Sequence, residues 1–318
     1  MAQLEQLLIG IGDLHGHFPA FGTLLYSLDQ QYNIFADQKD FVLRDDVKLV
    51  FTGDYIDRGD KGLMIIEKLQ ELSQKNPGKI VTLSGNHELM ALEESDVVKE
   101  ILGDMKYSKL KDVNEVYTEY LTRGMARGMS HGHNGGTEFL KEFGDNPQEL
   151  LENYVQRMAN DGDIGKWLRK LEPLYQTNFA GKRILFNHAD LPEKLDTDTQ
   201  IKKWTGKYRR AMEMPTVVHG GTDHKFGNRD LIIEGGLFWS RRYGHLTPGQ
   251  VDQLMENLKL DYMVCAHTPH DKIVSYGDRI FNIDVGMNKG NDPAAIVFKN
   301  DGIYGFYVEQ GEHKVIDF

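Results

Sequence analysis

The sequence contains a single cysteine, Cys265, among 318 residues. One thiol cannot form a disulfide within the chain, so an extracellular scaffold held together by disulfides is excluded. No apolar run approaches the ~20 residues that a membrane-spanning helix needs, and the first residues lack the basic segment of a secretory signal peptide. We therefore expect a cytoplasmic protein without a membrane partner.

An excess of basic residues is also lacking. The chain has 37 Lys and Arg against 48 Asp and Glu, which gives a net charge of −11. Surfaces that bind nucleic acid carry a positive field, so nucleic acid is an unlikely partner. Hydrophobic residues make up 40% of the chain, enough for a substantial core. Nothing in the composition determines the oligomeric state.

Five short apolar segments, each followed by polar residues, predict buried strands. They are residues 7–11, 48–52, 79–83, 183–186 and 262–265. Between the first three, apolar residues recur at helical spacing in 18–28 and 63–72. The alternation of strand and helix predicts a layered α/β protein. Residues 91–180 instead contain long helical patterns, and we interpret them as a mostly helical, cap-like insertion within one domain of residues 1–318.

Side chains able to bind metal ions follow every predicted strand. The first three strands run into Gly12-Asp13-Leu14-His15-Gly16, Gly53-Asp54-Tyr55-Ile56-Asp57-Arg58-Gly59 and Gly85-Asn86-His87-Glu88, and the last two run into Asn187-His188 and Ala266-His267. The carboxyl ends of strands in an open α/β sheet form the edge where ligands bind. A glycine precedes three of the polar residues and allows a sharp turn there. We expect these side chains to converge at one edge.

The donor set indicates metal binding. Carboxylate, imidazole and amide ligands suit Mn, Fe or Zn, and no thiolate is present among them. Asp54 has two carboxylate oxygens and can bridge two ions, as in two-metal sites that activate water for attack on phosphorus. Taken singly, each residue has an ordinary explanation, such as a turn aspartate or a buried histidine. Their joint occurrence at five strand ends favours the metal site.

The ordered residues Asp13, Asp54 and Asn86, followed by His188 and His267, resemble the motifs of the calcineurin-like metallophosphoesterases. Asp57-Arg58-Gly59 and Asn86-His87-Glu88 are similar to the phosphoprotein phosphatase branch. Trp239-Ser240-Arg241, Ala266-His267-Thr268-Pro269 and Ile283-Asp284-Val285-Gly286 are most similar to the Shewanella-like phosphatases. The resemblance covers residues 9–90, 183–190 and 231–287. It implies an α/β/β/α sandwich with the insertion 91–180 over the active-site edge.

The resemblance also implies two divalent metal ions, with manganese expected and iron or zinc as alternatives. One ion would be bound by Asp13, His15 and Asp54, and the other by Asp54, Asn86, His188 and His267. The usual His-Gly-Gly of the family stands here as His188-Ala189-Asp190, whereas a literal His219-Gly220-Gly221 comes later. We prefer His188 because a better strand precedes it, and His219 remains the alternative ligand.

By the same resemblance, His87 is the general acid that protonates the leaving alkoxide, and Asp57 holds it. Arg58 would bind phosphate oxygens, and Arg241 would provide a second guanidinium, with the adjacent Arg242 as its alternative. We expect a phosphoric monoester hydrolase in which a metal-bridging hydroxide attacks phosphorus. The expected type is a serine/threonine or tyrosine protein phosphatase acting on a phosphorylated protein, a peptide or a small phosphate ester.

Two alternatives and several unassigned residues remain. A dinucleoside polyphosphate hydrolase or nucleotidase would use the same metal site, and a catalytically silent scaffold or sensor would have kept only the fold. Among the other polar residues, Glu88 is expected to have a structural role, and Cys265 is expected to be a buried small hydrophobic residue. We interpret His131, His133 and His270 as loop histidines without a role at the site.

Overall fold

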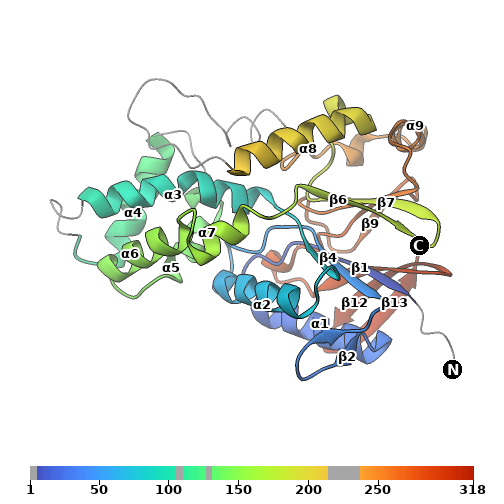
Figure 1. Cartoon of the computed structure of the whole chain (residues 1–318), viewed down its shortest axis with the longest axis horizontal. Helices are drawn as coiled ribbons and strands as arrows, with labels where there is room; N and C mark the ends of the chain where they lie inside the picture. The colour runs from blue at the N-terminus through green and yellow to red at the C-terminus, as the bar shows by residue number, and fades with distance from the viewer. Residues whose placement is uncertain (1–5, 105–109, 127–130, 214–236) are drawn as a thin grey trace.

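The computed structural model describes residues 6–104, 110–126, 131–213 and 237–318. Two β-sheets pack face to face in the body of the molecule, and a helical lobe extends from one end of them (Figure 1). The first sheet has the strand order β13-β12-β11-β1-β4-β5. Its strands are β1 (Leu7–Ile11), β4 (Val47–Phe51), β5 (Ile80–Thr82), β11 (Ala294–Lys299), β12 (Gly302–Glu309) and β13 (Glu312–Asp317).

The second sheet has the order β6-β7-β8-β10-β9. It consists of β6 (Leu174–Phe179), β7 (Lys182–Asn187), β8 (Tyr262–Cys265), β9 (Val274–Tyr276) and β10 (Ile280–Asn282), and a separate hairpin joins β2 (Phe35–Asp37) to β3 (Val42–Leu43). In the first sheet β1, β4 and β5 are parallel, and in the second β7, β8 and β10 are parallel. Their carboxyl ends therefore face one edge of the sandwich.

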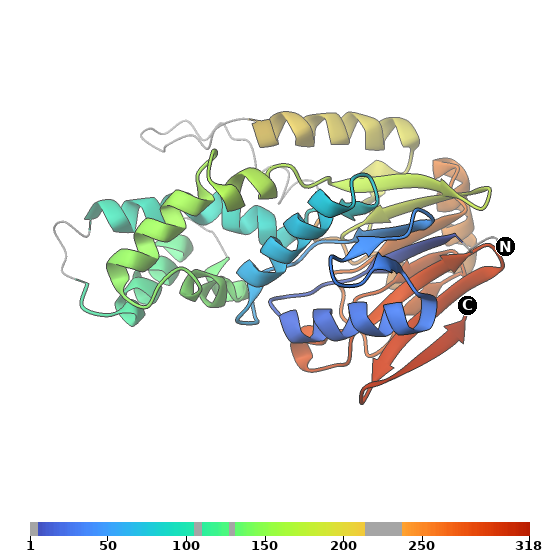
Figure 2. The same cartoon turned by 60° about the horizontal axis from the view of Figure 1, so that its bottom comes forward.

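Helices cover both outer faces of the sandwich, as Figure 2 shows. Helices α1 (Phe18–Tyr32) and α2 (Gly62–Lys75) lie on the six-stranded sheet, whereas α8 (Asp198–Glu213) and α9 (Pro248–Leu258) lie on the side of the five-stranded sheet. Thr247 and Gln250 form a capping box at the start of α9, which fixes where that helix begins. The predicted layered α/β sandwich is confirmed.

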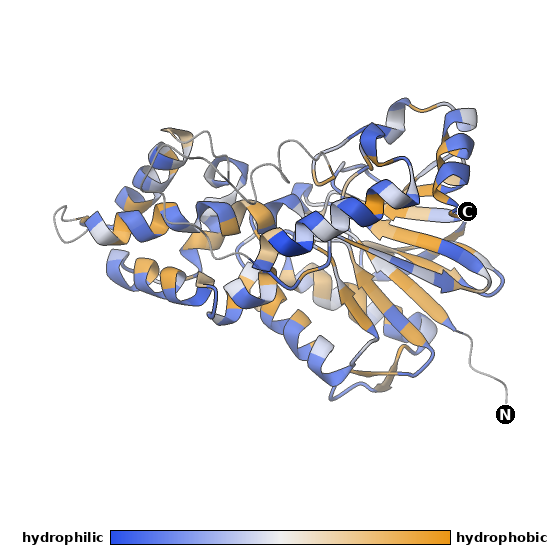
Figure 3. Ribbon diagram, turned by 45° about the horizontal axis from the view of Figure 1, so that its top comes forward, coloured by the Kyte–Doolittle hydropathy of each residue, from blue (hydrophilic) through white to orange (hydrophobic). Residues whose placement is uncertain are grey.

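The core lies between the sheets and under the outer helices, where Figure 3 shows apolar residues along the strands. Strand β1 is buried on both faces, with Ile9 and Ile11 fully buried, which explains why its sequence is continuously apolar rather than alternating. All five predicted strands are present, and each differs from its predicted bounds by no more than one residue at either end.

The helical lobe lies at the carboxyl ends of the strands (Figure 1). It contains α3 (Asn86–Asp104), α4 (Val113–Ala126), α5 (Gly136–Lys141), α6 (Pro147–Met158), α7 (Asp163–Leu168) and the short 3₁₀ helix η1 (Gly132–Asn134). The bounds of this lobe differ from the expected insertion 91–180 at both ends. Helix α3 already begins at Asn86, and residues 174–179 form a strand of the second sheet.

Among the residues that the structure describes, three further 3₁₀ helices connect the remaining elements: η2 (Glu193–Leu195), η4 (Tyr243–His245) and η5 (Met287–Lys289). In the ranges that are described, no helix combines the length and the apolar character needed to cross a membrane.

Candidate metal centre and active site

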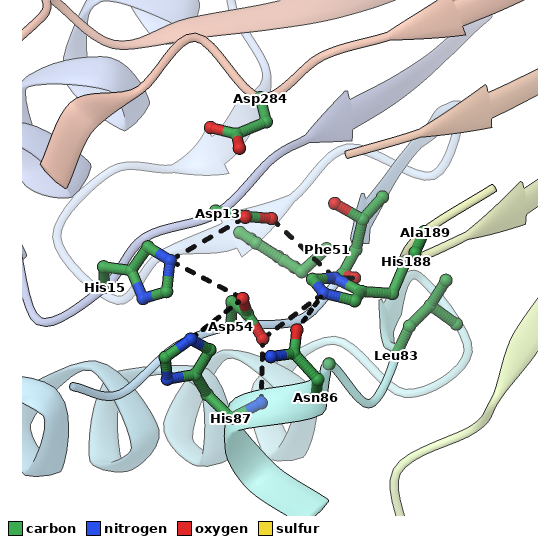
Figure 4. A network of polar contacts seen from close by, with 12 residues as sticks. Asp13, His15, Phe51, Asp54, Leu83, Asn86, His87, His188, Ala189 and Asp284 are labelled. Atoms are coloured by element: carbon green, nitrogen blue, oxygen red, sulfur yellow. Dashed lines mark hydrogen bonds and ion pairs between the residues drawn. The ribbon is translucent and has the colours of Figure 1, made fainter. Parts of the chain in front are cut away.

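Polar side chains from both sheets meet around Asp54 (Figure 4). Its Oδ2 lies 3.5 Å from Nε2 of His15 and 3.8 Å from Nε2 of His87. Its Oδ1 lies 3.4 Å from Nε2 of His188, which comes from the second sheet. Asn86 Oδ1 is 2.9 Å from the same His188 nitrogen. The ends of β1, β4, β5 and β7 thus converge on one buried carboxylate.

Two overlapping sets of potential ligands share Asp54. The ligand atoms of His15, Asp54 and His87 lie within 4.8 Å of one another, and so do those of Asp54, His188 and His267. Asp13 lies between the sets, with Oδ2 3.8 Å from His15 Nε2 and Oδ1 3.8 Å from His188 Nδ1. All six expected ligands are therefore in one cluster, and the shared carboxylate is placed where a bridging ligand would be.

The charge state of this cluster fits divalent cations. Burial raises the pKa of Asp54 to about 8, and burial lowers the pKa of His188 to about 3. Among the described residues, Asp13 Oδ1 and His267 Nε2 are buried and have no hydrogen-bond partner. A raised carboxyl pKa and a lowered imidazole pKa both show that the buried site lacks a positive charge that would stabilise the ionised carboxylates. A bound cation would supply that charge and use the unpartnered donor atoms.

Several site residues adopt strained backbone conformations. The φ angles are 40° at His15, 53° at Asp54, 71° at Asp57, 67° at Arg58 and 68° at His267. Positive φ is unfavourable for residues with a Cβ, and such strain persists only where the surrounding structure enforces it. Within the site these residues lie in the turns that follow β1, β4 and β8, although six other described non-glycine residues, outside the site, also have positive φ.

The three glycines that precede site residues act in different ways. Gly53 has a φ of 104°, so it provides the conformational freedom expected of it. Gly12 and Gly85 do not have positive φ, and both are needed for close approach instead. A Cβ on Gly12 would lie 2.6 Å from the carbonyl oxygen of Ile283, and one on Gly85 would lie 2.0 Å from Asp54 Oδ1. The absence of a side chain at Gly85 makes room for the central carboxylate.

Glu88 holds the turn that carries Asp54. Its carboxylate accepts hydrogen bonds from the backbone N–H groups of Asp54 (2.9 Å), Tyr55 (2.7 Å) and Gly85 (2.8 Å). Glu88 is fully buried, and burial raises its pKa to about 7 although these three bonds favour the ionised form. The expected structural role of Glu88 is confirmed, since it ties the second motif to the third.

His87 lies between a carboxylate and a guanidinium. Its Nδ1 is 2.5 Å from Asp57 Oδ2, and its Nε2 is 3.0 Å from Arg58 Nη2. The other end of the Arg58 fork, Nη1, is 2.6 Å from His15 Nε2. Burial lowers the pKa of His87, and the carboxylate of Asp57 only partly offsets this. The arrangement brings together an imidazole, its carboxylate partner and a bidentate donor for phosphate oxygens.

His131 was expected to be a loop histidine without a role at the site; it does lie in a turn, but its side chain reaches the site. It is fully buried, and its Nε2 lies 2.8 Å from Asp57 Oδ2, the oxygen that also contacts His87. Burial opposes protonation of His131, but the charge of Asp57 outweighs it and raises the pKa of the ring. Sequence reasoning missed this residue because no strand precedes it, and its contact depends on how the helical lobe folds.

Arg241 and Arg242, the two candidates for a second phosphate-binding arginine, have different surroundings. Arg242 Nη1 forms an ion pair with Asp196 at 2.9 Å. Arg241 is exposed, and its positive charge contributes, after burial, to lowering the pKa of His267. The neighbouring Trp239 packs edge-on against the His267 ring at 5.5 Å between centroids. The segment that contains Trp239 and Arg241 therefore lies beside the cluster of potential metal ligands.

The remaining expectations have mixed outcomes. Cys265 is fully buried, as expected, and burial raises the pKa of its thiol. His133 is exposed, and His270 Nε2 is 3.2 Å from the hydroxyl of Tyr276. His219 lies outside the described residues. His188, the preferred ligand, lies within the cluster.

Comparison with known proteins agrees with this geometry. Residues 7–271 match the model of the calcineurin-like phosphoesterase family. The chain is 23% identical to Shewanella-like protein phosphatase 2 of Arabidopsis thaliana, over 89% of this chain and 72% of that protein. It is 24% identical to Shewanella-like protein phosphatase 1 of Plasmodium berghei, over 97% of this chain and 72% of that protein.

A solved structure shows the same fold. The crystal structure of a cold-active protein-tyrosine phosphatase from a psychrophilic Shewanella species superposes with a TM-score of 0.64 at 18% identity. The match covers 98% of this chain and 80% of that one. At this identity the likeness concerns the arrangement of the elements, including the layered sandwich.

Proposed function

The chain belongs to the calcineurin-like phosphoesterase family, and from this we propose that it is a protein phosphatase that works with two divalent metal ions, with manganese as the expected metal. Its membership makes it a phosphoric ester hydrolase. The observation that carries the dinuclear proposal is the position of Asp54, which belongs to both ligand sets. Among the described residues, Asp54 is the carboxylate that occurs in both groups of three potential ligands.

We assign the ligands to the two ions as the family resemblance implies. Asp13, His15 and Asp54 would hold one ion, and Asp54, Asn86, His188 and His267 would hold the other. Two divalent ions bound there supply a water of lowered pKa and positive charge for the phosphoryl oxygens. The unpartnered buried atoms of Asp13 and His267 support this assignment. The resulting site suits hydrolysis in a single displacement at phosphorus.

The arginine and histidine side chains that do not bind metal would bind the phosphate and deliver a proton. His15 Nε2 has one lone pair, so it cannot bind a metal ion and contact Arg58 Nη1 at the same time. With His15 bound to a cation, Nη1 of Arg58 would be available for a phosphate oxygen. His87 keeps Nδ1 on Asp57. Its Nε2 contacts Arg58 Nη2 here, so it would carry the proton for the departing oxygen once the Arg58 fork turns to the phosphate. Arg241 would contact the phosphate from the opposite side.

The names of the relatives support a phosphorylated protein or peptide as the substrate, since the proteins of Arabidopsis and Plasmodium that match most of this chain are called protein phosphatases. We propose hydrolysis of phosphoserine, phosphothreonine or phosphotyrosine esters, which share a terminal phosphate that the two guanidinium groups can hold. A dinucleoside polyphosphate, in which the scissile phosphate is internal, serves as the competing substrate in the test.

The test is a hydrolysis assay on chelator-treated protein with and without added Mn²⁺. We expect metal-dependent release of phosphate from phosphopeptides, with slower cleavage of diadenosine tetraphosphate. Asp54→Asn should abolish the activity, whereas Asp45→Asn, at a fully exposed carboxylate, should retain it. Preference for the dinucleotide would overturn the protein phosphatase assignment. Absence of metal-dependent hydrolysis on every ester would identify a silent relative.

A further inference from the structure

Two imidazoles from distant parts of the chain contact one oxygen of Asp57. His87 Nδ1 lies 2.5 Å from Oδ2, and His131 Nε2 lies 2.8 Å from the same atom. All three side chains are fully buried. The other carboxylate oxygen, Oδ1, is buried and has no hydrogen-bond partner among the described residues, and the contact of His131 Nε2 with Oδ2 is an ion pair without hydrogen-bond geometry. The orientation of this carboxylate therefore depends on the two imidazoles that contact Oδ2.

His131 is itself held from three sides by the helical lobe. Its Nδ1 lies 2.6 Å from the hydroxyl of Tyr120 on α4, and its backbone N–H donates to Glu94 on α3 at 2.5 Å. Gly136 packs on the ring so closely that a Cβ there would lie 2.5 Å from Nδ1. A tyrosine hydroxyl both donates and accepts, so it can serve His131 in either charge state. These contacts hold the His131 imidazole in a single orientation.

The same turn also contacts the arginine of the second motif. The backbone N–H of Arg58 donates to the carbonyl oxygen of Gly135 at 3.3 Å, and Gly135 has a φ of 103°. A Cβ on Gly135 would lie 2.8 Å from Cγ of Arg58. The lobe therefore contacts Asp57 and Arg58 together, which are the residues that orient the acid and bind the phosphate in the proposed function.

We propose that His131, backed by Tyr120, is a positioning residue for the general acid: it fixes the Asp57 carboxylate so that Oδ2 stays on His87 Nδ1. With Nδ1 engaged in this way, His87 keeps its proton-delivering nitrogen, Nε2, directed into the site. Without His131, the buried carboxylate can rotate away, and His87 loses its fixed orientation. This inference rests on the proposed function, in which His87 protonates the leaving group.

The test compares two substrates that differ in their need for an acid. A phosphoserine peptide has an alkoxide leaving group that requires a proton, whereas 4-nitrophenolate leaves without one. His131→Leu should lower kcat for the peptide about tenfold or more, and kcat for the aryl ester less than about threefold. KM should stay within about twofold for both, because His131 does not touch the substrate. His131→Gln restores an N–H donor and should recover most of the loss.

A double-mutant cycle separates positioning from general stability. In the His87→Asn background, adding His131→Leu should change kcat for the peptide less than about twofold, because the group through which it acts is gone. Tyr120→Phe removes only the hydroxyl and should give the same substrate pattern with a smaller loss. His133→Leu, in the same turn but exposed, is the matched control and should leave both rates unchanged.

Equal losses of kcat on both esters in His131→Leu, or an additive loss in the His87→Asn background, would overturn the proposal and leave His131 with a structural role only. Unchanged rates on both esters would overturn it as well. Failure of the proposed function would look different, because the unsubstituted protein would then hydrolyse neither ester with added metal or would cleave diadenosine tetraphosphate in preference to the phosphopeptide.

Discussion

Substitution of Gly85 by alanine tests the site without replacing any ligand. A Cβ at this position would lie 2.0 Å from Oδ1 of Asp54 and 2.5 Å from its backbone nitrogen. Ordinary van der Waals contact begins at 3.4 Å, so the Asp54 carboxylate would have to move by about 1.4 Å, the difference between the two distances. The flexible end of a side chain cannot absorb this shift, because backbone atoms clash too.

The displacement is large compared with what a metal site tolerates, since ligand distances must hold within about 0.2 Å. We expect Gly85→Ala to weaken Mn²⁺ binding by about 10–100-fold, the range found when the surroundings of metal ligands are altered. The overpacked turn should also cost about 1–3 kcal/mol of the free energy of unfolding. The catalytic rate should fall with metal occupancy.

The assay is calorimetric titration of chelator-treated protein with Mn²⁺, together with phosphatase rates at saturating metal. Gly103→Ala is the matched control, because Gly103 lies near the end of α3 and a Cβ there meets nothing within 4 Å. It should bind metal normally and gain about 0.5–1 kcal/mol of helix stability. If Gly85→Ala binds Mn²⁺ as tightly as the unsubstituted protein, Asp54 is not the ligand around which the site is built.

Three other predictions address charge, phosphate binding and proton transfer. Burial raises the pKa of Asp54 to about 8, so in chelated protein it is protonated when folded and ionised when unfolded. The stability of chelated protein should therefore fall between about pH 4 and pH 8, and calorimetry should show its Tm dropping further below that of the metal-loaded protein; a gap independent of pH would contradict this. Arg241→Ala should weaken inhibition by inorganic phosphate about tenfold, whereas Arg242→Ala should chiefly lower the Tm through the lost Asp196 pair; the reverse outcome would exchange the two roles. His87→Asn should lower kcat for a phosphoserine peptide by about 10²–10⁴-fold and kcat for an aryl phosphate much less, and equal losses would refute its role as the acid.

Much of the fold follows from local sequence patterns. Short continuous apolar runs such as 7–11 and 262–265 cannot form amphipathic surface helices, so they predict strands buried on both faces. Parallel strands place their carboxyl ends at one edge, and the residues that follow them are then forced together. Asp13, Asp54 and His188 are therefore expected in one cluster, and the His188 imidazole does lie 3.8 Å from the Asp13 carboxylate and 3.4 Å from that of Asp54.

The helical lobe could not be predicted in the same way. His131 reaches Asp57 because α3 and α4 hold its turn, and neither a strand end nor a recurring spacing marks that contact in the sequence. The choice between Arg241 and Arg242 has the same cause. It depends on an ion pair with Asp196, a residue 46 positions away along the chain.

The central claim is that Asp54 joins two metal ions at the edge of the sandwich. Anomalous diffraction from crystals grown with Mn²⁺ tests it most directly. The account predicts two peaks per chain on opposite sides of the Asp54 carboxylate, one beside His15 and the other beside His188. A single peak, or peaks that Asp54 does not contact, would contradict it.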